Sequence, residues 1–309
     1  MINFYTSDNG ILRETSNAQT GCWVSVVAPT PQEIDSLINE YGLDSGFVKS
    51  SLDEEETSRI EKEDEQTLII IDTPVSSTDS SETKIFYTMP IGIILTKEHV
   101  FTISTHDNIQ IIEDAAGGVI RNLRPSFKTR FVLQLLLRIA ALFLIYLKQI
   151  DKISSAAEQQ LHDAMKNELL MQLLALEKSL VYFSTSIKAN EATIEKINRG
   201  RVIKLYDEDE HLLEDVMVEM KQAIEMASIY TAILSSMMDG FSSVISNNQN
   251  IVMWDLTIVT VILEIPNILF AFYGINTVDL PMPYTWFAIL ITAVLTGITA
   301  LVLLKWKKR

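Results

Sequence analysis

Polar residues recur at regular spacing inside an otherwise apolar segment, residues 251–273. On a helix that turns about 100° per residue, nearly all of them fall on one stripe. The stripe comprises Asn250, Met253, Leu256, Thr257, Thr260, Glu264, Asn267, Ala271 and Gly274. Polar groups are costly in hydrocarbon and usually face a bundle interior or a water-filled path. The stripe therefore predicts the lining of a pore. The alternative is that residues such as Thr260 and Asn267 only bond to backbone or to neighbouring helices.

Two segments near the C-terminus are long and apolar enough to cross a bilayer, which takes roughly 20 residues. Residues 251–273 form the first, and residues 284–304 form the second, which contains no charged residue. A basic cluster, Lys305 to Arg309, follows the second segment. Positive charge beside a span marks the cytoplasmic side. We therefore expect a plasma-membrane protein with two spans and with both termini in the cytoplasm. One real span plus a buried globular helix is the alternative.

One stripe in a chain of two spans cannot enclose a pore by itself. A pore lined by this stripe needs several copies of the chain, so we expect a homo-oligomer in the lipid bilayer. Asp255 lies on the opposite side of the first segment from the stripe, near its cytoplasmic end. There it can pair with Lys305 or Lys307 at the end of the second segment.

Charge is distributed unevenly along the 309 residues, whose net charge is −15. Residues 1–250 carry −16, whereas residues 251–309 carry +1. Nucleic acid is excluded as a partner, because a phosphate backbone needs a basic face. An acidic body can instead concentrate divalent cations. The acidic runs Asp53–Glu65 and Asp207–Glu219 are either solvated faces or a screen that divalent cations neutralise.

The first 122 residues predict a mixed α/β domain. Alternating or continuous apolar runs predict strands at Trp23–Ala28, Leu68–Asp72, Ile85–Tyr87, Gly92–Leu95 and Val100–Ser104. The sequence Thr30-Pro31-Gln32-Glu33 is a capping box that begins a helix.

From residue 123 the pattern is helical, with apolar residues three and four apart. We expect long helices at 127–150, at 154–198 and from 205 onward, with Gly200 between the last two. The predicted fold class is α+β. Its domains are a cytoplasmic α/β domain (1–122), long helices forming a coiled-coil stalk (123–250) and a transmembrane pore domain (251–309).

The sequence contains no recognisable catalytic motif. The four histidines are scattered and, with a single cysteine, form no zinc spacing; they are His99, His106, His162 and His211. Gly117-Gly118 is followed by no phosphate-loop lysine. We therefore expect neither an enzyme nor an organic cofactor.

A four-residue motif, Tyr-Gly-Ile-Asn, ends the first apolar segment and leads to the second. This arrangement resembles the CorA family of divalent-cation transporters, which carries Tyr-Gly-Met-Asn at the end of the first of two C-terminal spans. Residues 238–250, the basic C-terminal tail and the segment Arg59-Ile60-Glu61 are similar to that family as well. The resemblance covers most of the chain and is strongest from Asp207 to Arg309.

The resemblance implies a homopentameric funnel whose long third helix lines the pore. It assigns the selectivity filter to Tyr273, Gly274, Ile275 and Asn276. Asn276 would form a ring at the outer mouth with Gly274, where amide and carbonyl oxygens hold hydrated Mg²⁺ through its water shell.

The same resemblance implies roles along the stripe and the stalk. Met253 and Leu256 match a narrow apolar constriction that can close by dewetting, and Asn250 matches a polar ring below it. Asp215 and Asp239 match stalk acids that take part in cytoplasmic Mg²⁺ sensing. Mg²⁺ is thus implied as the transported ion, with Co²⁺ and Ni²⁺ as further candidates, and also as a regulatory ion that holds the pore shut.

Three departures from the family pattern bear on the ion and on its regulation. Isoleucine replaces methionine in the motif, and the related ZntB zinc transporters use Gly-Ile-Asn. Glu264 stands where the family usually has an apolar pore residue. Lys49-Ser50 stands where a Glu-Asp sensor pair is usual. Either Asp53–Glu56 supply carboxylates one turn later, with Asp53 and Glu54 as candidate regulatory metal ligands, or Lys49 neutralises Asp239 without metal.

Three functions are consistent with these observations. The first is an influx channel for Mg²⁺, gated by cytoplasmic divalent cation. The second is ZntB-like zinc transport. The third is a membrane-anchored coiled-coil scaffold or sensor that does not conduct.

Overall fold

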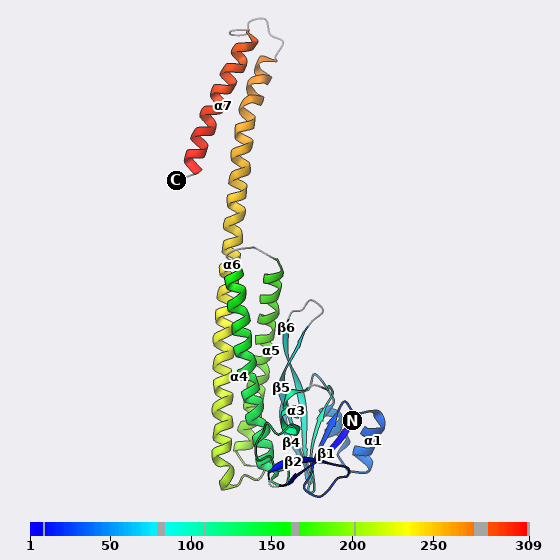
Figure 1. Ribbon diagram of the computed structural model, residues 1–309. Coiled ribbons are helices and arrows are strands. Elements are labelled where there is room, and N and C mark those ends of the chain that lie inside the picture. Colours follow the sequence, from blue (N-terminus) through cyan, green and yellow to red (C-terminus); the bar gives the residue numbers. More distant parts are fainter. Residues whose placement is uncertain are drawn as a thin grey trace. The chain divides into compact units, whose positions relative to one another are not determined.

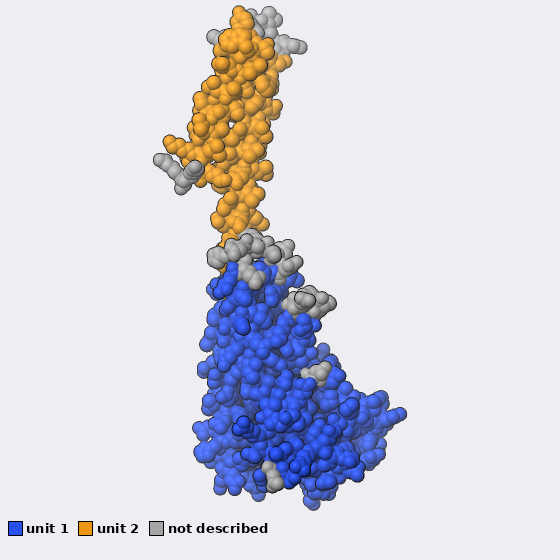
Figure 2. Space-filling model, viewed as in Figure 1, with its two compact units in different colours: residues 1–236 blue, residues 237–309 orange. Residues whose placement is uncertain are grey.

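The structure is a computed structural model that describes residues 1–8, 10–78, 84–107, 109–161, 167–200, 202–274 and 284–307. The chain forms two compact units, Met1–Ser236 and Met237–Arg309, coloured separately in Figure 2. The strands are β1 (Ile2–Asp8), β2 (Ile11–Thr15), β3 (Trp23–Val27), β4 (Arg59–Glu63), β5 (Gln66–Thr78), β6 (Lys84–Leu95) and β7 (Val100–Ser104). The helices are α1 (Pro31–Asn39), α2 (Ser45–Ser51), α3 (Gln110–Ala116), α4 (Lys128–Leu161), α5 (Asn167–Asn198), α6 (Glu210–Tyr273) and α7 (Thr285–Lys307).

The first unit is built on a seven-stranded sheet with the strand order β2-β1-β3-β7-β6-β5-β4 (Figure 1). Only β3 and β7 pair in parallel; the other neighbours are antiparallel. The two strands predicted at Ile85–Tyr87 and Gly92–Leu95 are one strand, β6. That prediction was wrong because Pro90 does not end the strand. Strand β7 pairs only with Gly92–Leu95 of β6, so at Pro90 the strand is paired with β5 alone. The edge of β6 that has no partner there tolerates a residue without an N–H group.

One face of the sheet packs against α1 and α2. Alternation in β3 decides which residues point there: Val24 and Val26 join a core with Leu37 of α1 and Phe47 of α2. The predicted capping box of α1 is confirmed. The Thr30 side chain accepts from the Glu33 N–H, and the Glu33 carboxylate accepts from the Thr30 N–H at 2.8 Å.

The opposite face packs against α4 and α5, which lie along β5 and β6 in Figure 1. An aromatic cluster forms this layer. Phe86 of β6 contacts Tyr146 of α4, with ring centroids 5.7 Å apart, and Phe183 of α5, at 6.3 Å. Trp23 of β3 contacts Phe131 of α4 at 5.7 Å. The long helices therefore complete the core of the α/β domain.

Helix α4 continues to Leu161, past the break predicted between residues 150 and 154. The prediction was wrong because no glycine or proline interrupts this stretch. The hydroxyl of Ser154 donates to the Asp151 carbonyl at 2.9 Å, so its polar group is satisfied within the helix. Gly200, with φ of +65°, follows the end of α5 as expected.

Asn190 of α5 links that helix to the backbone of β5. Its side chain is fully buried. The Asn190 amide donates to the Asp72 carbonyl at 2.8 Å, and its oxygen accepts from the Asp72 N–H at 3.0 Å and from the Ser58 hydroxyl at 2.7 Å. One side chain thus satisfies polar groups of both the sheet and the loop before β4.

Replacing Asn190 with Ala is expected to lower the free energy of unfolding by about 2–4 kcal/mol, because buried polar groups lose their partners. The measurement is the thermal or denaturant unfolding of the full-length chain. Asn198→Ala, at the exposed end of α5, is the matched control and should change stability by less than about 0.5 kcal/mol. Equal stability of the two variants would show that the Asn190 bonds contribute little.

Candidate ion pathway

Three helices in the described part of the chain are long and apolar enough to cross a membrane. They are Lys128–Gln159, Asp207–Tyr273 and Thr285–Lys307. The apolar stretch of the first is 67% buried inside the chain, whereas those of the other two are 6% and 11% buried. The apolar surface of Lys128–Gln159 is therefore buried in the core of the first unit, whereas the apolar surfaces of the other two helices are exposed.

The predicted stripe is exposed over its whole length on α6. Every residue of the stripe, from Asn250 to Gly274, is solvent-exposed in the single chain. The buried and half-buried residues of this part of α6 lie roughly on the opposite side of the helix; they are Asp255, Ile258, Ile262, Ile265, Pro266, Leu269 and Tyr273. The second unit thus covers the apolar side of α6 and leaves the polar stripe uncovered.

Helix α7 is tied to α6 by two contacts at one end of the pair. Lys307 of α7 forms an ion pair with Asp255 of α6, which confirms the predicted partner of that carboxylate. Beside it, Trp254 and Trp306 meet edge to face with ring centroids 6.3 Å apart. These contacts lie on the side of α6 that faces away from the stripe.

Reversing the charge of Asp255 is expected to loosen the α6–α7 pair. Asp255→Lys places two cations together, whereas the exchange Asp255→Lys with Lys307→Asp restores an ion pair. Because the pair is about half exposed, we expect a coupling of only about 0.5–1 kcal/mol in a double-mutant cycle. The cycle is measured by thermal stability of the purified chain in detergent. If the exchange variant loses as much stability as the two single variants lose together, the ion pair contributes nothing and the prediction is wrong.

The polar side chains of the stripe use their hydrogens within α6. The hydroxyl of Thr257 donates to the Met253 carbonyl, and that of Thr260 donates to the Leu256 carbonyl, both at 2.8 Å. The amide of Asn267 lies 3.4 and 3.5 Å from the two carboxylate oxygens of Glu264.

At Thr257 and Thr260 this arrangement leaves the hydroxyl lone pairs, rather than the O–H groups, free to face outward. The threonine hydroxyls donate to backbone carbonyls of their own helix. This bonding was the alternative to a pore lining that the sequence left open. The waters around a cation point their hydrogens outward and seek acceptors. Oxygen ligands are also those that Mg²⁺ prefers. The stripe is therefore chemically suited to a hydrated cation.

The predicted filter lies at the end of α6. The Gly274 N–H donates to the Phe270 carbonyl at 2.9 Å, which continues the helical bonding to the motif. Tyr273 is half-buried and meets Phe272, with ring centroids 5.6 Å apart. Ile275 and Asn276 lie outside the described residues, so their roles stay predictions.

The candidate sensor acids are exposed. Glu54 lies 3.3 Å from the Nδ1 atom of His106, and the Asp53 carboxylate accepts from the Glu55 N–H at 3.0 Å. Asp215 and Asp239 are exposed on α6. Over the described residues, no group of three metal-ligating side chains converges. The regulatory ion expected between copies of the chain stays a prediction.

An ion-pair cluster beside Lys49 and Ser50 was not predicted. Arg59 pairs with Glu56 and, at 3.2 Å, with Glu61, and it donates to the Ser50 hydroxyl at 3.1 Å. The Arg59 guanidinium holds the pKa of Glu56 below its usual range. The signal was the spacing of Arg59 two residues before Glu61, which puts both side chains on one face of β4. The Ser50 hydroxyl is therefore a hydrogen-bond acceptor within this ion-pair cluster.

The histidines each have a different environment. His99 lies in the first unit with its Nδ1 atom 3.3 Å from the Cys22 sulfur, and partial burial lowers its pKa. His106 faces Glu54, and exposed His211 faces Glu214 at 3.9 Å. His162 lies outside the described residues.

The fold and the stripe together define a class: an α/β body joined to a pair of apolar helices, one of which carries a cation-compatible polar face. Comparison with known proteins agrees with that class. The family described as "CorA-like Mg²⁺ transporter protein" matches residues 18–309. This chain therefore belongs to the CorA family, and the resemblance stated from the sequence is confirmed.

Individual relatives support the same assignment. The cobalt/magnesium transport protein CorA of Methanocaldococcus jannaschii is 28% identical over 273 residues, covering 84% of this chain and 81% of the relative. The complete structure of the CorA magnesium transporter from that organism covers 100% of this chain and 98% of its own, with a TM-score of 0.79 and 23% identity. The ZntB cytoplasmic domain from Vibrio parahaemolyticus covers 80% of this chain and 97% of its own, with a TM-score of 0.61 and 13% identity.

These likenesses bear on fold and class. The predicted fold class, an N-terminal mixed α/β domain followed by long helices and a C-terminal helix, is confirmed. The relatives are transporters rather than enzymes. The division into domains at residues 122 and 250 stays a prediction.

Proposed function

We propose that this protein transports divalent metal cations across the plasma membrane, with Mg²⁺ as the principal ion and Co²⁺ and Ni²⁺ as further candidates. Membership of the CorA family supports the class of cargo. The relative named as a cobalt/magnesium transport protein supports the choice of ions. The proposed assembly is a homopentamer with two spans per chain and with the body and both termini in the cytoplasm.

One observation carries the proposal: an exposed stripe repeats with spacings of four and three residues along α6. In the first unit it comprises His211, Asp215, Val218, Gln222, Glu225, Ile229, Ala232 and Ser236. In the second unit it comprises Asp239, Ser243, Ser246, Asn250, Met253, Thr257, Thr260, Glu264, Asn267, Ala271 and Gly274. All of these residues are exposed.

A mean spacing of 3.5 residues is the repeat by which helices supercoil around a common axis. A dry helical seam would need large apolar residues at these positions. Here polar and small residues dominate instead, which favours an axis that contains water and ions. Because α7 covers the other side of α6, additional copies of the chain are needed to cover the stripe.

Within this pathway, the roles follow the chemistry of each position. Asn276 and Gly274, with Tyr273 and Ile275, form the outer filter. Met253 and Leu256 are the large apolar side chains of the stripe between Asn250 and Gly274, and a ring of them closes by dewetting. Asn250 forms a polar ring on the cytoplasmic side of that constriction. The remaining oxygen ligands are supplied by Thr257, Thr260, Glu264 and Asn267.

Ion entry needs no chemical energy source. A divalent cation moving down a membrane potential of about 100 mV gains about 4.6 kcal/mol, twice the value for one charge. Regulation is assigned to Asp215, Asp239, Asp53 and Glu54, where cytoplasmic Mg²⁺ bound between copies would screen their repulsion and hold the pore shut. The net charge of −16 on residues 1–250 supports such screening.

Zinc transport is the second candidate. It is favoured by the Gly-Ile-Asn form of the motif and by the likeness to a ZntB domain. A membrane-anchored scaffold that does not conduct is the third candidate, and it requires no acceptor-lined stripe.

Ion flux into proteoliposomes separates these functions. The full-length chain is reconstituted, a negative internal potential is imposed, and uptake of Mg²⁺ and Zn²⁺ is followed with internal dyes. We expect Mg²⁺ uptake that rises with the potential. Uptake of Zn²⁺ without Mg²⁺ would favour the second candidate. A folded oligomer that admits neither ion would refute both transport functions.

A further inference from the structure

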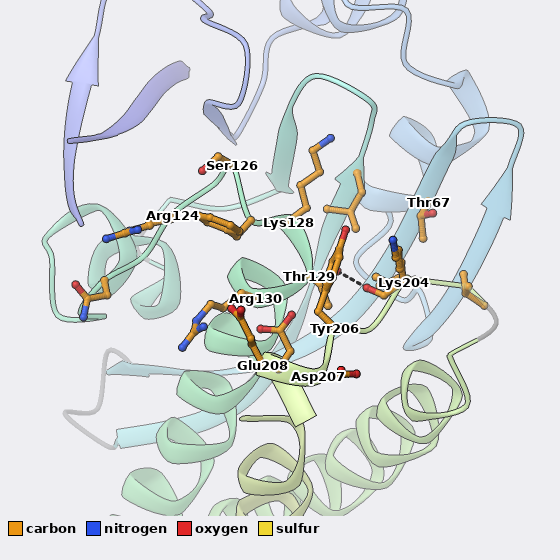
Figure 3. Close-up of a pocket in the computed structure, with 16 residues that line it drawn as sticks. Thr67, Arg124, Ser126, Lys128, Thr129, Arg130, Lys204, Tyr206, Asp207 and Glu208 are labelled. Carbon is orange, nitrogen blue, oxygen red and sulfur yellow. Dashed lines mark hydrogen bonds between the residues drawn. The ribbon is translucent and has the colours of Figure 1, made fainter. Parts of the chain in front are cut away.

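A cavity of about 1050 Å³ lies in the first unit, beside the start of α4 (Figure 3). One wall is the segment that leads into α4, residues 122–130. The other is the segment between α5 and α6, residues 202–209, and the ends of β5 and β6 complete the cavity at Thr67 and Leu95. Its volume is at the upper end of typical ligand pockets, about 300–1,000 Å³. None of the residues predicted for the pore lines it, but Asp207, Glu208 and Asp209 of the acidic run predicted as a possible divalent-cation screen do.

The cavity is the place where an acidic body gathers its basic residues. Residues 1–250 contain 37 acidic and 21 basic residues. Seven of the basic residues occupy the two short stretches 121–130 and 199–204. The four that line the cavity are Arg124, Lys128, Arg130 and Lys204. Three acidic residues, Asp207, Glu208 and Asp209, line the cavity as well, so its basic residues outnumber its acidic ones by one. The cavity thus carries a small positive charge within an acidic body.

Three of these cations are available to a ligand. Lys128 is not, because its ammonium donates to the carbonyls of Thr96 and Lys97 at 2.6 Å each. Arg124, Arg130 and Lys204 are exposed, and Figure 3 shows the two arginines on one side of the cavity and Lys204 on the other. Guanidinium groups bind phosphate oxygens in pairs, and an ammonium adds a point charge.

Aromatic and acidic groups stand beside these cations. Phe127 is 58% exposed and Tyr206 is 53% exposed, so both offer ring faces for stacking. The Lys204 ammonium lies 4.9 Å from the centre of the Tyr206 ring. Asp207 and Glu208 line the same wall as Tyr206 and are exposed. A simple anion such as phosphate uses neither the rings nor the carboxylates.

We propose that this cavity binds a nucleoside polyphosphate in its Mg²⁺-bound form. Arg124, Arg130 and Lys204 hold the phosphates, and the base stacks on Tyr206 or Phe127. The carboxylates of Asp207 and Glu208 face the bound Mg²⁺ or the sugar hydroxyls. Asp207 to Asp209 lead directly into α6, so the ligand contacts the segment from which the stripe-bearing helix begins. The proposal does not depend on conduction.

The test is equilibrium binding of ATP to the full-length chain in detergent, at a fixed excess of free Mg²⁺. We expect saturable binding of one ATP per chain. Each of Arg124→Ala and Arg130→Ala should weaken it about tenfold or more, the usual loss for a charge-assisted hydrogen bond. Lys204→Ala should also weaken it, whereas Lys188→Ala, an exposed lysine on α5, should have no effect. Far-UV circular dichroism checks that each variant is folded.

Inorganic triphosphate and adenosine complete the design. We expect ATP to bind more tightly than either, and Tyr206→Ala to reduce its advantage over triphosphate. Triphosphate bound as tightly as ATP would overturn the assignment to a nucleotide. Absence of saturable ATP binding at millimolar concentration, or ATP binding that none of the variants changes, would overturn the site itself.

Discussion

Replacing Asn276 with Ala is expected to abolish Mg²⁺ flux while leaving the oligomer intact. The change removes one amide from every copy around the proposed outer mouth. If each amide contributes about 1 kcal/mol to holding the hydrated ion, the ring loses several kcal/mol. Flux should then fall by a factor of about 100 or more. The measurement is potential-driven Mg²⁺ uptake into proteoliposomes that contain equal amounts of protein.

Asn198→Ala is the matched control, because it removes an exposed asparagine from the end of α5, far in sequence from the motif. Its flux should equal that of the unchanged protein. Size-exclusion chromatography shows whether both variants keep the same oligomeric state. Normal flux through Asn276→Ala would refute the filter role of this residue.

Replacing Glu264 with Gln is expected to weaken the preference for divalent over monovalent cations. Glu264 is exposed on the stripe, and α7 has no charged residue between Thr285 and Leu304 to neutralise it. Each copy therefore adds one uncompensated carboxylate to the pathway. We expect the apparent affinity for Mg²⁺ to fall about tenfold, equivalent to roughly 1.4 kcal/mol per ion. Uptake is measured over a range of Mg²⁺ concentrations with and without competing Na⁺.

Glu195→Gln is the control for this prediction, since Glu195 is an exposed glutamate on α5, outside the stripe. It should leave the apparent affinity unchanged. An unaltered selectivity profile would assign Glu264 to structure instead.

The helices that carry the candidate pathway could be predicted from the sequence because they depend on local pattern. A polar stripe on one helix needs only a 100° turn per residue, and an uncharged apolar run of the right length needs no tertiary information. The capping box at Thr30 was predictable for the same reason. The partner of Asp255 followed from placing two spans side by side.

Features that depend on tertiary contacts were harder to predict. Strands β1 and β2 are mostly half-buried or exposed, so they lack the buried apolar run that indicated the other strands. The buried Asn190 bonds join residues more than 100 positions apart. The basic cavity is formed by two segments that lie some 75 residues apart in the sequence. They are joined by the Thr129 hydroxyl, which donates to the Lys204 carbonyl at 2.8 Å. None of these pairs has a local signature.

The central claim is that the exposed stripe of α6 lines the cation path, and a single introduced cysteine tests it directly. Cys22 is the only cysteine and is buried in the first unit, so Cys22→Ser gives a cysteine-free background. Thr260→Cys then places one thiol on the stripe, and Val259→Cys places one on an exposed position beside it. Only a thiol in water ionises and reacts with a charged, membrane-impermeant thiol reagent.

Mg²⁺ flux into proteoliposomes is measured before and after the reagent is added. Modification is expected to stop flux through Thr260→Cys and to leave flux through Val259→Cys unchanged. Flux through Thr260→Cys that persists after the reagent, with Val259→Cys blocked instead, would contradict the claim that the stripe faces the ions.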